Sequence, residues 1–153
     1  MTAAPVFRRA DPHEGALLRA ITREAYAKWV PVLGREPLPM TTDHDAAVRA
    51  HHVEFVETGA RAVAAMELVF DAGHLLIENI AVRPEAQRRG LGDLILARAE
   101  TVARERGYST VRLYTNSLMA GNVDWYRARG YAVEREEPFG NGARVHLAKS
   151  LSG

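Results

Sequence analysis

The sequence predicts an α/β (α+β) domain in which a mixed sheet of about seven strands is flanked by about four helices. Three observations indicate this. Short apolar segments of strand length occur throughout the chain. They alternate with longer segments whose apolar residues recur at helical spacing. The length of 153 residues, with 47% hydrophobic and 25% charged residues, suits one globular domain, so we expect a single domain over residues 1–153.

Composition excludes several classes of protein. The chain has no cysteine, which excludes disulfides, zinc–thiolate sites, iron–sulfur clusters and cysteine nucleophiles, and suits a reducing compartment. Its 20 basic and 19 acidic residues are mixed along the chain, so no basic block indicates nucleic-acid binding. There is no signal-peptide pattern, and no apolar stretch approaches the ~20 residues of a membrane span. We therefore expect a soluble, cytoplasmic protein that binds neither nucleic acid nor membranes.

The N-terminal elements follow from capping residues and prolines. A short strand over residues 6–9 precedes a helix that starts at Asp11, where an N-cap carboxylate is followed by Pro12 at N1 and Glu14 at N3. Apolar residues then continue at helical spacing as far as Trp29. Prolines at positions 31, 37 and 39 predict a loop, and a second helix capped by Thr42 or Asp43 runs to residue 51.

Strands dominate the rest of the chain, interrupted by two helices. The predicted strands cover residues 53–57, 62–70, 75–82, 110–114, 131–137 and 144–149, and the predicted helices cover residues 90–106 and 118–129. The first two of these strands form a hairpin around Thr58-Gly59. The strand over residues 75–82 is nearly all apolar, which predicts a central position in the sheet.

The turn after that strand has the features of an anion site. Gln87–Asp93 joins the strand to a helix and contains Gly90 and Gly92, which allow a ligand to approach the backbone closely. The first amides of a helix point outward and carry the positive end of its dipole, and Arg88 adds positive charge. The alternative is that the glycines only allow tight strand–helix packing.

Two common phosphate motifs do not fit this turn. A P-loop requires Gly-Lys-Ser/Thr, but Asp93 follows Gly92. The dinucleotide fingerprint requires glycine at its sixth position, where this chain has Ile95. The pattern that remains is Gln-x-x-Gly-x-Gly directly after a strand.

This pattern resembles the acetyl-CoA signature of the GNAT (Gcn5-related) N-acetyltransferase superfamily. The resemblance continues through nearly the whole chain, including Leu-Ile-Glu-Asn-Ile-Ala-Val at 76–82, Leu-Tyr-Thr-Asn at 113–116 and Arg-Val-His at 144–146. It implies a mixed, mostly antiparallel sheet and an acetyl-CoA-dependent N-acetyltransferase. In that family the strand before the turn pairs with pantetheine and the amides of the turn hold the CoA pyrophosphate.

The resemblance assigns cofactor-binding residues position by position, with acetyl-CoA as co-substrate and no metal. The pantetheine residues are Ile80, Ala81, Val82 and Asn122, and the pyrophosphate residues are Gln87, Arg88, Arg89, Gly90, Leu91, Gly92 and Asp93.

Glu78 is the candidate general base. An ammonium has no lone pair, so its proton must be removed before the nitrogen attacks a thioester. A carboxylate inside an apolar strand is costly unless it is paired or functional, and burial would raise its pKa toward the range that a base needs. The alternatives are an exposed strand end or an arginine partner. Some amine-acetylating members of the superfamily carry a glutamate here, so the resemblance favours the base. Neighbouring Asn79 could orient a water or substrate, or make a ladder-side hydrogen bond.

Tyr126 is the second candidate catalytic residue. It lies four residues after Asn122, so both share one face of the predicted helix. The resemblance implies that Tyr126 hydrogen-bonds the CoA sulfur as general acid or thiolate stabiliser. The alternative is a core tyrosine beside Trp125.

Other reaction chemistries have little support. The six histidines do not form a His-Glu-x-x-His pattern, so we expect no metal site. No serine lies in Gly-x-Ser-x-Gly, which argues against an acyl-enzyme and for direct transfer from the cofactor.

Apolar residues around the loop between the first two predicted helices are the candidates for binding the acceptor. Tyr26, Trp29 and Leu33, together with Val30, Val32 and Met40, could wall an acceptor pocket, and Phe139 could close its opposite side. The same residues could instead pack against the sheet. We predict a small-molecule amine acceptor. The alternatives are a peptide or protein N-acetyltransferase, or a non-catalytic acyl-CoA-binding regulatory module. A homodimer is common in the superfamily and is left open by the sequence.

Overall fold

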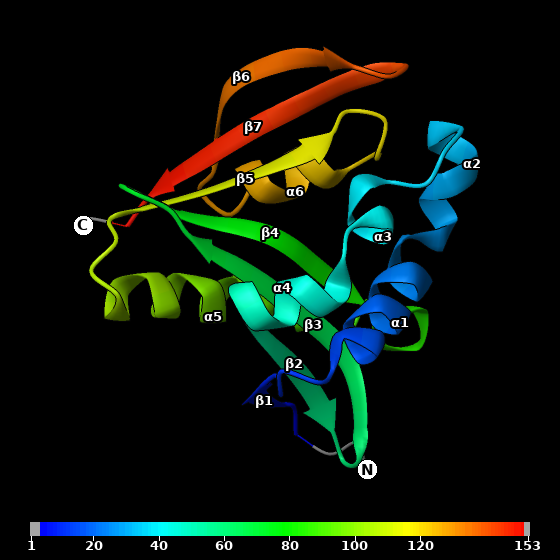
Figure 1. Cartoon of the computed structure of the whole chain (residues 1–153). Helices are drawn as coiled ribbons and strands as arrows, with labels where there is room; N and C mark the ends of the chain where they lie inside the picture. Colours follow the sequence, from blue (N-terminus) through cyan, green and yellow to red (C-terminus); the bar gives the residue numbers. More distant parts are fainter. Residues whose placement is uncertain (1–3, 152–153) are drawn as a thin grey trace.

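A single seven-stranded sheet organises the computed structural model, which describes residues 4–151 (Figure 1). The strands are β1 (Val6–Arg9), β2 (His52–Thr58), β3 (Arg61–Phe70), β4 (Leu75–Val82), β5 (Thr110–Asn116), β6 (Ala132–Phe139) and β7 (Gly142–Ser150). The α-helices are α1 (Gly15–Tyr26), α2 (Val30–Leu33), α3 (Leu38–Thr41), α4 (His44–Ala50), α5 (Leu91–Glu105) and α6 (Asn122–Arg127). Short 3₁₀ turns, η1 (Ala27–Trp29) and η2 (Pro84–Ala86), follow α1 and β4. None of the helices within residues 4–151 is long and apolar enough to cross a membrane.

The strand order confirms the predicted mixed, mostly antiparallel sheet. It runs β1-β2-β3-β4-β5-β7-β6, and every neighbouring pair is antiparallel except β4 and β5. The apolar strand β4 occupies the middle of the sheet, as its composition predicted.

Helices cover both faces of the sheet and bury a separate apolar cluster on each. Leu18 and Ile21 of α1 pack on Phe55 on one face, where α4 also contributes. Ile95 of α5 packs with Leu68 and Leu147 on the other face. Burial of this kind contributes roughly 25 cal/mol per Å² of apolar surface, so these two clusters hold the layers together.

A β-bulge in β4 changes which face its side chains occupy. Glu67 of β3 is opposite Asn79, but the next residue, Leu68, is opposite Ile77, so Glu78 has no partner in β3. Ile77 packs in the cluster under α5, whereas Asn79 donates a hydrogen bond of 3.0 Å to Thr22 of α1 on the opposite face. The bulge therefore places Glu78 at the position where the two halves of the strand change face.

The parallel strands β4 and β5 pair along only part of their length. Their register covers Leu75–Ile77 against Val111–Leu113 and then stops. Both strands continue beyond this point, and Figure 1 shows them diverging toward α2 and α3. The second half of β4 therefore has no neighbouring strand on its β5 side.

Two N-terminal expectations are corrected. Helix α1 begins at Gly15 instead of Asp11. The Asp11 carboxylate accepts a hydrogen bond from the His13 amide, and the Glu14 carboxylate accepts one from the Asp11 amide, so these residues close a separate turn before the helix. The expected loop after Trp29 contains the short helices α2 and α3, because two of its prolines lie in first turns, where proline is tolerated.

The other helices and strands begin and end close to the predicted residues, except that α6 begins later. Asp43 is the residue that caps α4, by accepting from the amide of Ala46. Helix α6 begins at Asn122, later than the expected residue 118, because residues 117–121 form turns that end at Gly121 with φ +85°.

Acid should destabilise the fold through Glu54, which is buried beneath α5. Its carboxylate lies 2.6 Å from His52 Nε2 and accepts hydrogen bonds of 2.9 and 3.0 Å from Arg98. Burial raises the pKa of Glu54, but the His52 and Arg98 hydrogen bonds outweigh it and lower the pKa to about 2. A lowered folded-state pKa stabilises the fold above the unfolded pKa of 4.5. We expect this part of the unfolding free energy to disappear as the pH falls from 4.5 toward 2. Circular-dichroism denaturation should show a shallower acid dependence in Glu54→Gln, and an unchanged slope would contradict the assignment.

Candidate active site

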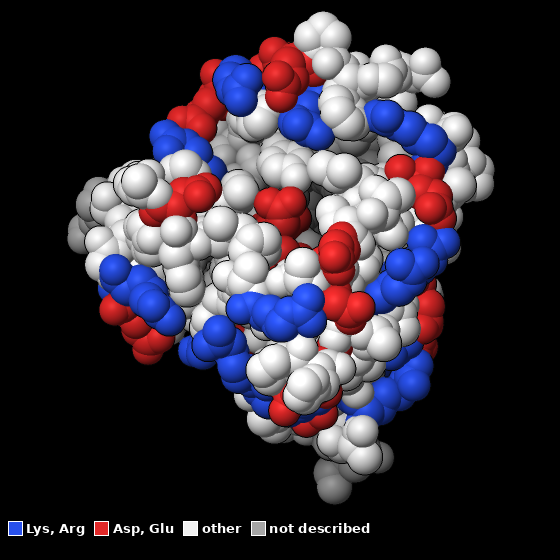
Figure 2. Space-filling model, in the orientation of Figure 1, with Lys and Arg blue, Asp and Glu red and all other residues white. Residues whose placement is uncertain are grey.

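A cavity of about 680 Å³ lies where β4 and β5 diverge. It is enclosed by the end of α1, the α2–α3 segment, the start of α5, α6 and the β6–β7 hairpin. Figure 2 shows this face of the molecule hollowed between side chains of both charges. All predicted catalytic and cofactor-binding residues line the cavity except Ala81, which is buried under α1 and α4, and Arg89, which is exposed outside the lining.

The turn before α5 aims its backbone at the cavity. Arg88 and Gly90 both adopt left-handed conformations, with φ +64° and +79°, and the 15-residue helix α5 starts directly after them. Consecutive amides in such a turn form a concave anion site that is reinforced by the helix dipole. The Gln87 side chain braces the turn by donating to the Val82 carbonyl at 2.9 Å, and it accepts from Lys28 Nζ at 3.1 Å.

The two glycines of the turn have different structural causes. Gly90 supplies a positive φ, and the space around its missing Cβ is open. A Cβ on Gly92 would lie 3.2 Å from Cζ2 of Trp125, so this glycine lets α6 pack over α5. Close packing therefore explains the glycine at position 92. The packing is between two helices, whereas the sequence alternative was packing between a strand and a helix. Asp93 is held by an ion pair with Arg129, which neutralises a carboxylate next to the proposed phosphate position.

Glu78 reaches the cavity with a tyrosine as its partner. Its carboxylate accepts a hydrogen bond of 2.9 Å from the Tyr114 hydroxyl. No described cation lies within 4.0 Å of it, so neither alternative expectation, an exposed strand end or an arginine partner, describes its surroundings. Burial raises the pKa of Glu78, while the hydrogen bond from Tyr114 partly opposes that shift. The group is therefore a carboxylate with enhanced basicity, located at the bulge of β4.

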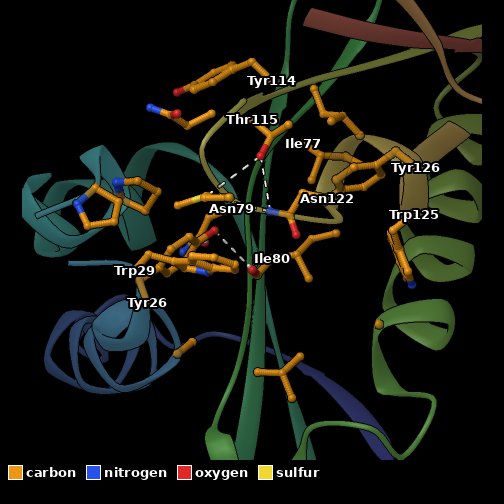
Figure 3. Close-up of a pocket in the computed structure, with 18 of the residues that line it drawn as sticks. Tyr26, Trp29, Ile77, Asn79, Ile80, Tyr114, Thr115, Asn122, Trp125 and Tyr126 are labelled. Carbon is orange, nitrogen blue, oxygen red and sulfur yellow. Dashed lines mark hydrogen bonds between the residues drawn. The ribbon is translucent and has the colours of Figure 1, made fainter. Parts of the chain in front are cut away.

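Tyr126 and Asn122 enter the cavity from α6. Figure 3 shows both side chains projecting from α6 toward β4, which agrees with the predicted shared face. The Asn122 amide donates to the Thr115 hydroxyl at 3.3 Å. Burial raises the pKa of Tyr126 to about 12, so its phenol keeps its proton at neutral pH. Trp125 packs edge-on against the Tyr126 ring, with ring centroids 5.0 Å apart.

The acceptor wall is only partly as expected. Tyr26, Trp29 and Leu33 line the cavity, and so does Phe139. The other three predicted members do not line it. Val30 and Val32 lie outside the lining, with Val32 50% exposed, and Met40 is buried in the protein at 3% exposure. The short helical segments cause this difference, because Trp29 and Leu33, four residues apart, share the side toward the cavity, and Val30 and Val32 lie on other sides.

Asn79 joins β4 to α1. Its Oδ1 accepts a hydrogen bond of 3.1 Å from the Tyr26 hydroxyl, and its amide donates to Thr22. The side chain is thus engaged by α1 instead of the strand ladder, and a contact with substrate stays a prediction.

Several cavity residues were missed by sequence reasoning. They come from β5 and the turn after it, from α6, from the β6–β7 hairpin and from the segment that leads into α3, and they include Tyr114, Thr115, Asn116, Met119, Trp125, Arg144, Arg35, Pro37 and Leu38. The available signal for Tyr114 was its position at the end of a predicted strand that a predicted helix separates from the Glu78 strand. That order is typical of parallel strands, whose carboxyl ends meet at one edge of a sheet.

Five of the six histidines have carboxylates or backbone oxygens as partners. His51 Nδ1 lies 2.6 Å from Glu67, and His44 Nε2 lies 2.8 Å from the Pro39 carbonyl. Within the described chain, no group of three or more His, Asp or Glu side chains is arranged to hold a metal ion.

Residues 17–131 match the model of the acetyltransferase (GNAT) family. Because the match spans most of the chain, the protein belongs to this family of acetyl-CoA-dependent acyltransferases. The fold that encloses the cavity is thus that of a GNAT acetyltransferase.

Solved structures show the same fold at low sequence identity. A GNAT-family protein from Desulfovibrio desulfuricans is similar with a TM-score of 0.78 at 18% identity, covering 97% of this chain and 100% of that one. The PaiA N-acetyltransferase from Thermoplasma acidophilum, in complex with coenzyme A, has a TM-score of 0.75 at 15% identity, with coverage of 96% and 99%. The ribosomal-protein-S18-alanine N-acetyltransferase from Escherichia coli has a TM-score of 0.76 at 17% identity, with coverage of 98% and 96%. No curated protein matches the sequence.

Proposed function

We propose that residues 1–153 form one catalytic domain that transfers an acetyl group directly from acetyl-CoA to the primary amine of a small molecule. The observation that carries this proposal is one cavity lined by both Glu78 of β4 and Tyr126 of α6, next to the turn before α5. A base and a hydrogen-bond donor on opposite sides of one reacting centre are what amine acetylation requires. The cytoplasmic location and a homodimer stay predictions.

The cofactor would lie along β4 and end at the turn. The half of β4 beyond Ile77 has no strand on its β5 side, so its backbone can pair with the amide groups of pantetheine. The amides of the Arg88–Gly92 turn would hold the pyrophosphate. Asn122 projects from α6 toward β4 and would contact the pantetheine arm. CoA-bound structures of the same fold, such as that of the PaiA N-acetyltransferase, support this use of the fold.

The two catalytic residues have different roles in the transfer. Glu78 takes a proton from the acceptor ammonium, and the free nitrogen lone pair then forms a C–N bond to the thioester carbon as the C–S bond breaks. The second proton of the attacking nitrogen passes to the released thiolate, which leaves as the CoA thiol. A phenol with a pKa of about 12 is a weaker acid than a thiol near 8.5, so Tyr126 stabilises the departing thiolate by donating a hydrogen bond. No acyl-enzyme is needed in this sequence of steps.

A small acceptor fits the closed end of the cavity. The Arg35 guanidinium of the loop before α3 lies 4.5 Å from the centre of the Phe139 ring, so this loop meets the β6–β7 hairpin over the acceptor end. A peptide acceptor could enter this end only if the contact between Arg35 and Phe139 were broken.

The test is CoA-thiol release with acetyl-CoA across small amines, amino acids, antibiotics and peptides. Turnover confined to small amines supports the proposal. Preferential turnover of peptides would replace it by the peptide alternative. Tight acetyl-CoA binding without turnover of any amine would indicate a regulatory binding module.

Arg88 and Arg89 provide a matched test of the cofactor turn. Only Arg88 lines the cavity, although the two residues are adjacent and both exposed. Arg88→Gln should weaken CoA binding about fivefold at low salt, because it removes one charge near the phosphates, and added salt should shrink the difference. Arg89→Gln should change affinity much less. Calorimetry at two ionic strengths measures both, and equal losses for the two variants would contradict the described orientation of the turn.

A further inference from the structure

Two arginines contact one aromatic ring at the acceptor end of the cavity. The guanidinium carbons of Arg35 and Arg144 lie 4.5 and 4.1 Å from the centre of the Phe139 ring. Arg144 also lies 4.8 Å from the centre of the Tyr114 ring. The two arginines come from the loop before α3 and from β7, and all four side chains line the cavity. Stacking on aromatic rings orients the guanidinium groups and leaves their N–H donors available at the edges.

Neither arginine is neutralised by a close carboxylate. Within residues 4–151, Arg35 has no ion-pair partner within 4.0 Å. The ion-pair partner of Arg144 is Glu137 at 4.0 Å, and that carboxylate is nearer to His146 at 2.8 Å and Arg135 at 3.5 Å. By contrast, the guanidinium of Arg98, which pairs with a carboxylate in the fold, lies only 2.9 Å from Glu54. The acceptor end therefore carries positive charge without a close partner.

Tyr114 contacts one acidic and one basic side chain. Its hydroxyl donates to Glu78 at 2.9 Å, and Arg144 lies over its ring. Glu78 and Arg144 do not pair directly within 4.0 Å, so each is available to a ligand. A molecule with an ammonium and a carboxylate a few bonds apart would complement this pair. Trp29, Leu33 and Leu38 supply an apolar wall beside it.

We propose that the acceptor is an amino acid: its ammonium lies at Glu78, its carboxylate is held by Arg144 and Arg35, and its apolar remainder contacts Trp29 and Leu33. This inference rests on the proposed acetyl transfer to a small amine and adds the class of acceptor. A planar guanidinium matches a carboxylate with two parallel hydrogen bonds. A polyamine would instead bring a second positive charge toward two arginines.

The test compares matched sets of acceptors that differ only at the carboxylate. Leucine, methionine and phenylalanine are each assayed beside the corresponding amide and the corresponding decarboxylated amine. Rates are expressed per neutral amine, because the three forms differ in amine basicity. In at least one set the free acid should be preferred about 10- to 100-fold in kcat/KM, the effect of losing a charge-assisted hydrogen bond.

The arginine variants connect that preference to the two side chains. Arg144→Gln and Arg35→Gln should raise KM for the acid and remove most of the preference, and Arg144→Lys should restore part of it. Arg135→Gln is the control, since Arg135 lies in the same hairpin, contacts the same Glu137 and is outside the cavity lining. Unchanged CoA affinity by calorimetry shows that each variant is folded.

The outcomes separate this inference from the proposed function. Better acetylation of the amides or decarboxylated amines, or a preference that survives Arg144→Gln and Arg35→Gln, would overturn the amino-acid inference and leave N-acetyl transfer intact. Failure to acetylate any amine, with normal acetyl-CoA binding, would overturn both.

Discussion

Glu78→Gln is expected to lower kcat/KM for the best amine by about 10²–10⁴-fold, the range of a true general base. Glutamine keeps the size of the side chain and can still accept a hydrogen bond from Tyr114, but it cannot take a proton from an ammonium. Acetyl-CoA affinity should stay nearly unchanged, because Glu78 lies at the bulge of β4 and not at the anion turn. A rate loss smaller than about threefold would mean that the residue only attracts the ammonium or supports the fold.

The pH profile gives an independent readout of the same residue. Burial raises the pKa of Glu78, and only its ionised form can accept a proton. The rate should therefore fall as the pH drops through this raised pKa. In the complex a bound ammonium favours the carboxylate, so the acidic limb of kcat should lie at lower pH than that of kcat/KM. Glu78→Gln should remove the limb, and a limb that persists unshifted would assign it to another group.

Tyr114→Phe serves as the companion variant. The hydrogen bond from Tyr114 lowers the pKa of Glu78, so its loss should move the acidic limb to higher pH. The rate at high pH should fall less than in Glu78→Gln, because the base is still present. A purely structural role for Tyr114 would reduce activity without moving the limb.

Tyr126→Phe is expected to lower kcat by about 10²–10³-fold, the cost of removing one preorganised donor to a developing anion. Cofactor affinity should change little, because the hydrogen bond strengthens only as the sulfur becomes anionic. With a pKa raised to about 12, the phenol stays protonated through neutral pH, so Tyr126 itself should give no basic limb there.

Tyr108→Phe is the control for this loss of a hydroxyl. The Tyr108 hydroxyl donates to the Asp71 carbonyl at 2.9 Å and does not line the cavity. Wild-type kcat in Tyr126→Phe, measured where single-turnover experiments show chemistry to be rate-limiting, would contradict the assignment.

The main elements of the fold could be predicted because their signals are local. Apolar periodicity, capping residues and glycines located the long helix α5 and the apolar strand β4. The bulge at Glu78 could not be predicted, because it depends on how β4 pairs with β3 and leaves no mark in an apolar run. The short helices α2 and α3 were missed for a related reason, since prolines in a first turn look the same in sequence as prolines in a loop.

The site residues also differ in whether their positions could be predicted from local sequence. Asn122 and Tyr126 are four residues apart on one helix, so their shared direction follows from helical geometry alone. Tyr114 and Arg144 meet Glu78 only through the pairing of β4, β5 and β7, which joins residues far apart in the chain. Ala81 is absent from the cavity lining because the change of face at the bulge buries its side chain under α1 and α4, while its backbone belongs to the half of β4 that has no neighbouring strand on its β5 side.

The positions of the tryptophans give the protein a built-in optical probe. The chain has two tryptophans, and both line the cavity, Trp29 near the acceptor end and Trp125 over the glycine turn. Intrinsic emission excited at tryptophan wavelengths therefore originates entirely from the walls of the site. Trp29→Phe leaves an emitter that senses the cofactor end, and Trp125→Phe leaves one that senses the acceptor end. The order in which two ligands bind can then be followed by stopped-flow fluorescence without attaching a label.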